Sequence, residues 1–136
     1  MRVVLDTSVL IAALAKPSGA AARIVRAWRN GEIEAVASEA TLREAELVIG
    51  AGWAARLSSR AEVDRLLRDL RGRTVRVTPQ TIRDLALKDE GDLRLVEAAV
   101  AGDADYVVTA DRELLSKRGY SRTEFVTASE FWRRTS

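Results

Sequence analysis

The sequence has 136 residues, of which 47% are hydrophobic and 31% charged, and it contains neither His nor Cys. We expect residues 1–136 to form one globular domain, because a chain of this length buries enough surface for its own core. Without Cys there is no disulfide or thiolate chemistry, and without His there is no Ser-His-Asp triad or ordinary zinc site. Of the remaining means of catalysis, carboxylates and metal ions are the ones this composition favours.

Short apolar strands alternate with helical segments. The strands are expected at Val3–Leu5, Ile33–Ala37, Thr74–Val77, Tyr106–Thr109 and Phe125–Val126. The helices are expected at Ala20–Asn30, from Ser38 to Gly50, at Arg60–Arg71, Asp92–Ala101, Asp111–Lys117 and after Thr127. Ser59 with Glu62, and Thr127 with Glu130, have the spacing of capping boxes. This alternation predicts an α/β fold with a mostly parallel sheet covered on both faces.

No apolar run approaches the roughly 18 residues that a membrane helix needs. The first residues faintly resemble a signal peptide, but Asp6 interrupts the apolar segment. We therefore expect a cytoplasmic protein that does not bind a membrane.

Two carboxylates follow predicted strands. Asp6 comes directly after Val3–Leu5, and Asp111 comes two residues after Tyr106–Thr109. Functional groups of parallel sheets gather at the carboxyl ends of the strands, so both are candidate site residues. The alternative for each is that it caps the helix behind it.

Two more carboxylates lie on helix faces that the spacing predicts to be buried. At about 100° per residue, Glu44 falls between Ala40 and Val48, and Asp92 falls beside Val96, whereas Glu97 points away. The alternatives are a solvated Glu44 at the rim of the apolar face and an Asp92 that caps its helix. Asp89 is either an outer member of the same group or a solvent-facing residue.

Asp6, Glu44, Asp92 and Asp111 together suggest one acidic pocket. Clustered carboxylates repel one another, and a hard divalent cation relieves that repulsion. Mg²⁺ or Mn²⁺ suits such an all-oxygen site best, and it activates water without help from His.

Four segments in their order and spacing resemble the PIN-domain ribonucleases, most closely the toxin components of prokaryotic toxin–antitoxin pairs. They are Val4–Leu10, Glu44–Ile49, Lys88–Asp92 and Ala104–Leu115. The resemblance runs from Arg2 to about Trp132. It implies a three-layer α/β/α domain with a sheet of about five strands, and hydrolysis of single-stranded RNA by metal-activated water that leaves 5′-phosphate and 3′-hydroxyl ends.

The resemblance places the metal-binding and catalytic acids at Asp6, Glu44, Asp92 and Asp111. Asp89 matches a less essential acid of the family, and the supporting hydroxyls are Thr7, Ser8 and Thr109. Asp6, Asp92 and Asp111 would hold the metal, and Glu44 would bind it or orient the water. The sequence departs from the family where Ala110 replaces a common Gly, Ser8 replaces a frequent Asn, and Glu90-Gly91 replaces a Pro-containing step.

The leading hypothesis is therefore a Mg²⁺- or Mn²⁺-dependent ribonuclease, with RNA as substrate, a cognate antitoxin as protein partner, and a homodimeric state. The alternative is a non-catalytic PIN-like module that binds RNA or protein. Phosphoaspartate chemistry at Asp6 is disfavoured, because Ser8 stands where phosphatases of that type place a second Asp.

The charge distribution suggests where RNA binds. Residues 52–83 carry eight Arg and three acids, whereas residues 84–113 carry nine acids and three cations. The Arg side chains are expected either to follow an RNA backbone or to form salt bridges with the solvated helix surface. Trp28 and Trp132 are expected in the core or an interface. Trp53 is either a rim residue of a dimer or substrate site, or ordinary packing.

Overall fold

A computed structural model describes residues 1–136 and contains one six-stranded sheet. The strands are β1 (Arg2–Leu5), β2 (Glu34–Ala37), β3 (Thr74–Arg76), β4 (Tyr106–Val108), β5 (Gly119–Tyr120) and β6 (Thr123–Val126). Their order is β3-β2-β1-β4-β6-β5, and only β5 is antiparallel to its neighbour. The predicted α/β class and mostly parallel sheet are confirmed.

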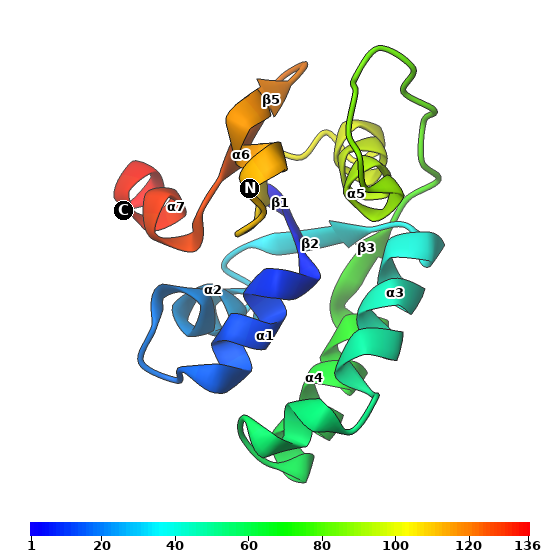
Figure 1. Cartoon of the computed structure of the whole chain (residues 1–136). Coiled ribbons are helices and arrows are strands. Elements are labelled where there is room, and N and C mark those ends of the chain that lie inside the picture. The colour runs from blue at the N-terminus through cyan, green and yellow to red at the C-terminus, as the bar shows by residue number, and fades with distance from the viewer.

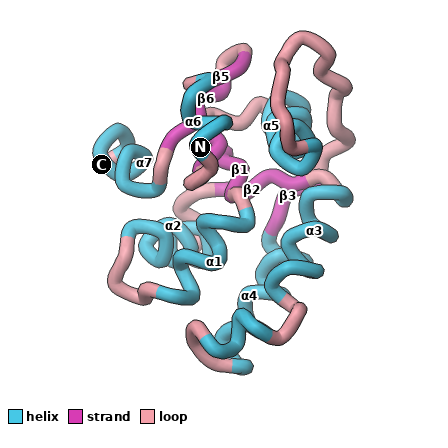
Figure 2. Tube along the Cα trace, in the orientation of Figure 1, coloured by secondary structure: helices cyan, strands magenta, loops and turns pink.

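The helices pack on both faces of this sheet (Figures 1 and 2). They are α1 (Thr7–Ala15), α2 (Ala20–Arg29), α3 (Glu39–Ile49), the 3₁₀ turn η1 (Trp53–Arg56), α4 (Arg60–Arg73), α5 (Glu90–Ala101), α6 (Arg112–Lys117) and α7 (Ala128–Thr135). Helices α3 and α4 form a hairpin that extends away from the sheet (Figure 1).

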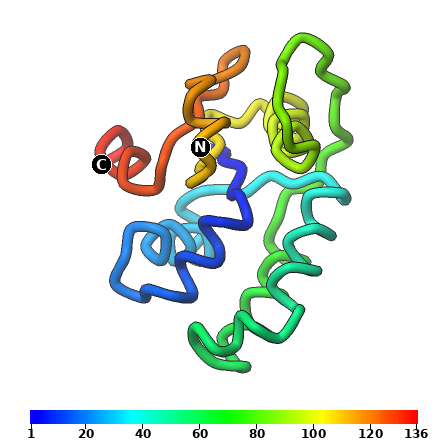
Figure 3. Tube along the Cα trace, viewed as in Figure 1, coloured from blue at the N-terminus to red at the C-terminus, as the bar shows by residue number.

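Successive side chains of a strand point to opposite faces, and this alternation divides the core in two. Val3 packs in a cluster with α1, α2, α3, α4 and α7, whereas its neighbour Val4 packs in a second cluster with α5 and α6. The sheet is therefore the middle of three layers. The chain runs from β1 in the centre of the sheet to α7, which lies beside α2 (Figure 3).

The sequence did not predict α1. Nearly every residue from Thr7 to Ala15 is apolar, so the segment lacks the polar face that makes a helix recognisable from its pattern. Its Val9, Leu10 and Leu14 are buried. The two-residue strand β5 was also missed, because it is too short for an alternating pattern.

The helix starts agree with the predictions except in detail. Ser38 and Thr41 form a complete capping box, whereas the Ser59 and Thr127 hydroxyls each accept only the backbone N–H three residues on. The predicted boxes at Ser59 and Thr127 were thus half right, since the Glu130 carboxylate pairs with Arg134 instead. Helix α5 begins at Glu90, two residues before its predicted start.

No single helix is both long and apolar enough to cross a membrane; α1 and α2 meet that test only as a pair bent by 105°.

Candidate functional site

The site begins where β1 and β4 end side by side. These strands are parallel, so Asp6 and the segment 109–111 leave the sheet at the same edge. The Asp6 N–H donates to the Val108 carbonyl at 3.0 Å, which continues the ladder to the first residue of the site. The prediction that Asp6 and Asp111 emerge at the carboxyl edge of the sheet is confirmed, and the structure adds that their strands are neighbours.

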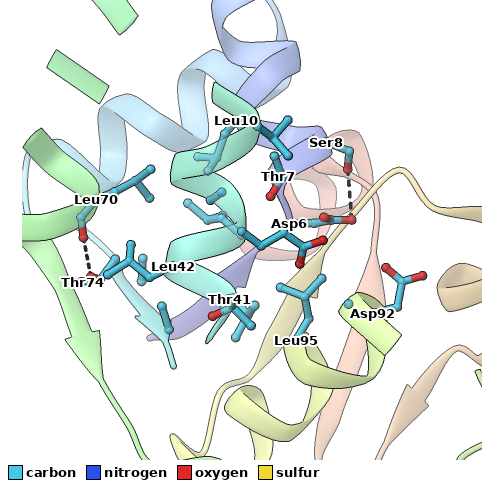
Figure 4. Close-up of a pocket in the computed structure, with 18 of the residues that line it drawn as sticks. Asp6, Thr7, Ser8, Leu10, Thr41, Leu42, Leu70, Thr74, Asp92 and Leu95 are labelled. Atoms are coloured by element: carbon cyan, nitrogen blue, oxygen red, sulfur yellow. Dashed lines mark hydrogen bonds between the residues drawn. The ribbon is translucent and has the colours of Figure 1, made fainter. Parts of the chain in front are cut away.

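Two hydroxyls fix the Asp6 carboxylate. Thr109 Oγ1 donates to Asp6 Oδ2 at 2.6 Å and accepts from the Asp111 N–H at 2.9 Å. Ser8 Oγ donates to the same Asp6 oxygen at 3.2 Å and accepts from the Ala110 N–H at 3.2 Å (Figure 4). Because each hydroxyl bridges the carboxylate and the 110–111 backbone, the loop after β4 is held against Asp6.

The acidic residues singled out in the sequence line one cavity of about 300 Å³. They are Asp6, Glu44, Asp89, Asp92 and Asp111, and Thr7 and Ser8 lie on the same wall. Leu10, Leu42 and Leu95 line the apolar part of the cavity (Figure 4). Four segments distant in sequence thus contribute carboxylates to one concave site.

Asp92 is the most buried of these acids, with 8% of its surface exposed. Its Oδ2 is buried and has no hydrogen-bond partner. Burial, followed by the negative charges of Asp111, Asp6 and Asp89, raises the pKa of Asp92 to about 7. The predicted burial of this helix position is confirmed, and the carboxyl group needs a proton or a cation.

Glu44 reaches the cavity, but not for the reason that the helix spacing suggested. Residues 40 and 44 are exposed and Leu47 is 76% exposed, whereas the buried face of α3 centres on Leu42, Ala45 and Ile49. The prediction that Glu44 lies on the buried apolar face was therefore wrong. Glu44 is at the rim of that face, beside Val48, and its carboxylate turns into the cavity.

Gly91 makes room for Glu44. A Cβ atom at Gly91 would lie 2.9 Å from both carboxylate oxygens of Glu44 and 3.0 Å from Asp89 Oδ1. Any larger residue would push Glu44 away from Asp89. In the sequence Gly91 stands out only as a departure from the family. Its position in the first turn of a helix, next to two acids, is the signal that could have predicted this role.

Asp89 and Asp111 also cap helices. Asp89 Oδ1 accepts from the Gly91 N–H at 2.7 Å, and Asp111 Oδ1 accepts from the Leu114 N–H at 3.0 Å. The Asp6 side chain makes no such bond to α1. The capping alternative thus holds for Asp111 and not for Asp6.

Glu97 was predicted to point away from the buried face of its helix, but it is itself buried. Glu97 is only 4% exposed, and its carboxylate accepts the Ile82 N–H at 3.0 Å and pairs with Arg94 at 2.9 Å. The loop of residues 77–89 packs Ile82 and Leu85 with α5, so that this helix has a second buried side. Glu97 anchors the loop that leads to Asp89.

No three acidic side chains stand close enough together to hold one metal ion between them. The donor set nevertheless fits a hard divalent cation, because it consists only of carboxylate oxygens and includes the unpartnered Asp92 Oδ2. Which of these acids are metal ligands stays a prediction.

Half of the eight Arg residues in the Arg-rich segment 52–83 form salt bridges. Arg60, Arg71, Arg73 and Arg76 form ion pairs with acidic side chains. The indole N–H groups of Trp28 and Trp132 donate to backbone carbonyls within the fold. Trp53 is 39% exposed on η1.

The family model described as PIN domain matches residues 2–113. This match spans most of the sequence, and the chain belongs to the PIN-domain family. PIN domains are generally nucleases and typically use divalent metal ions, so membership supports a hydrolase acting on nucleic acid in broad terms. Comparison with curated proteins and with solved structures gives no significant match.

Proposed function

We propose that this protein is a Mg²⁺- or Mn²⁺-dependent endoribonuclease that hydrolyses single-stranded RNA. The observation that carries the proposal is the convergence of Asp6, Glu44, Asp92 and Asp111 on one cavity, with a buried and unpartnered oxygen on Asp92. A concave site with a carboxyl group whose pKa is raised to about 7 is typical of catalytic centres.

We assign a role to each acidic residue of the cavity according to its surroundings. Asp6, Asp92 and Asp111 would hold the metal ion, with Asp89 as an outer ligand. A bound divalent ion supplies activation of water and neutralises charge that develops on the phosphate. Glu44, which is exposed at the mouth of the cavity, would bind the ion or orient the attacking water.

The supporting residues keep the acids in place. The hydroxyls of Thr109 and Ser8 donate to Asp6 Oδ2, so this oxygen is fixed while Oδ1 accepts no protein hydrogen bond. Thr7 lines the same wall of the cavity. Preorganised donors and acceptors of this kind spare the reaction the cost of rearranging the site.

The resemblance also leads us to propose a cytoplasmic toxin that forms a homodimer and is restrained by a cognate antitoxin. Leu47 on α3, Trp53 on η1 and Leu57 after it are exposed large apolar side chains, and we propose that they contribute to the contact with a protein partner. Light scattering of the wild type and of Leu47→Ser tests the dimer: a monomeric wild type would contradict it.

The nuclease proposal is tested with pure protein and mixed RNAs, in Mn²⁺ or EDTA, with the product ends mapped. We expect cleavage only with metal, 5′-phosphate ends, and no cleavage by Asp6→Asn that retains its circular dichroism spectrum. A folded wild-type protein that cleaves no RNA in Mn²⁺ would refute the proposal.

A non-catalytic module that binds RNA or protein is the second candidate. It is favoured by the observation that no three acids stand close enough to hold one ion. Tight RNA binding without products, unaffected by Asp111→Ala, would support it.

A further inference from the structure

Two cations without partners are sequence neighbours of acids that line the cavity. Lys88 precedes the cavity residue Asp89, and Arg112 follows the cavity residue Asp111. Both are exposed, and neither side chain forms an ion pair or a hydrogen bond within the protein. Their charges are therefore available to a ligand.

A hydrogen bond outside the cavity brings the two segments together. Glu113 Oε1, in the first turn of α6, accepts the Lys88 backbone N–H at 2.9 Å. The end of the 77–89 loop is thereby fixed to the start of α6, so the backbone of Lys88 lies next to the helical turn that contains Arg112. The Glu113 carboxylate is used by a backbone amide and does not pair with the Lys88 ammonium.

Four Arg residues of the Arg-rich segment 52–83 also have no ion-pair partner: Arg56, Arg65, Arg68 and Arg83. Arg83 lies in the 77–89 loop that leads to Lys88, and the other three lie on η1 and α4. Arg56 belongs to η1 and Arg65 to the N-terminal half of α4, at the end of the α3–α4 hairpin that is remote from the strand ends (Figure 1). Helix α4 is 14 residues long, which corresponds to about 20 Å. Arg56 and Arg65 are poorly placed to touch RNA held at the cavity.

A phosphodiester that approaches this site meets repulsion. Five carboxylates line the cavity, and even one bound divalent cation would leave the group negative if most acids are ionised. Phosphates next to the scissile one therefore need cations outside the acidic group. Lys88 offers a mobile point charge, and Arg112 offers a planar fork that matches phosphate.

We propose that Lys88 and Arg112 form a phosphate-binding rim that holds the RNA backbone beside the scissile phosphodiester. This inference rests on the proposed nuclease function and adds where the substrate backbone lies. Because the rim contacts phosphates that do not react, it acts on substrate binding and leaves the chemical step unchanged.

The test compares Lys88→Gln/Arg112→Gln with Arg56→Gln/Arg65→Gln, which removes the same charge from the hairpin. With a fluorescent 12-nucleotide RNA in Mn²⁺, we expect the rim variant to raise KM at least tenfold and to keep kcat within about threefold of wild type. The dependence of log(kcat/KM) on log salt concentration should become shallower by about 1.4, the value for two phosphate contacts on a single strand. The hairpin variant should match the wild type in all three quantities.

A measurement of RNA binding tests the phosphate-binding rim independently of the nuclease proposal. Fluorescence anisotropy of the same RNA with Asp6→Asn, with and without the rim substitutions, needs no turnover, and we expect at least tenfold weaker binding without the rim. If the wild type cleaves no RNA, the nuclease proposal fails, but the anisotropy experiment still shows whether Lys88 and Arg112 bind RNA. The proposal that Lys88 and Arg112 bind phosphates is refuted if the rim variant binds and cleaves RNA as the wild type does. It is also refuted if the hairpin variant has the larger defect.

Discussion

Replacing Asp92 by Asn should stabilise the metal-free protein at pH 8. Asp92 Oδ2 is buried without a partner, and burial with three nearby acids raises the pKa of Asp92 from 3.8 to about 7. A shift of this size corresponds to about 4 kcal/mol, and screening at the open side of the cavity reduces this to about 2 kcal/mol. An Asn side chain removes the charge and can donate a hydrogen bond to Asp111, as only the protonated Asp92 can.

The effect has a defined pH window. The folded protein binds the Asp92 proton more tightly than the unfolded chain does, so the free energy of unfolding falls as pH rises from about 4 to about 7. Above pH 7 the full penalty of the ionised group is present, and below pH 4 it is absent. The free energy of unfolding of Asp92→Asn should therefore be higher than that of the wild type by about 2 kcal/mol at pH 8 and equal to it near pH 4.

Urea unfolding in EDTA, followed by tryptophan fluorescence, measures this difference at pH 4, 6 and 8. The control is Glu32→Gln, which removes an exposed carboxylate that has no ion-pair partner. Equal stability of Asp92→Asn and wild type at pH 8, or a less stable variant, would show that Asp92 is not held among the other acids, and the reasoning about the cavity would fail.

Three other perturbations probe the same cavity. Thr109→Val removes the hydroxyl between Asp6 and the Asp111 N–H, and it should lower the free energy of unfolding by about 1–3 kcal/mol in urea titrations. Gly91→Ala should leave the melting temperature unchanged or higher, because Ala favours helix, yet reduce RNA cleavage by displacing Glu44; unchanged cleavage would mean that Glu44 is dispensable. Mn²⁺ should raise the wild-type melting temperature, reversibly with EDTA, since binding only the folded state stabilises it; an unchanged melting curve would argue against a metal site.

The strand ends were the most predictable part of the site. An apolar run of three or four residues identifies a buried parallel strand, and the sheet rule then places Asp6 and Asp111 at one edge without knowledge of any side-chain contact. Both strands are in the middle of the sheet, where flanking helices leave few arrangements open.

Helix faces were less predictable, because the helical wheel assumes one buried stripe. Helix α3 packs against α1, α4 and α5. Small residues such as Ala40 do not indicate which side of the helix is buried, and the large side chains of Leu42 and Ile49 form the buried face instead. On α5 the loop 77–89 covers a second side and buries Glu97. Long-range packing of a loop cannot be read from the periodicity of the helix that it covers.

A carboxylate can cap a helix with one oxygen and bind a metal ion with the other, so the two explanations of these acids are compatible. Asp111 and Asp89 each use Oδ1 to cap a helix, and Asp6 uses Oδ2 to accept from two hydroxyls, so in each carboxylate the second oxygen accepts no hydrogen bond from the protein. Asp92 and Glu44 accept none with either oxygen. A cap that fixes one oxygen orients the other, and in this way the local signals that start helices α5 and α6 also aim carboxylates into the cavity. An Asp that follows a buried strand and caps the next helix is therefore still a candidate metal ligand, even where its capping hydrogen bond is complete.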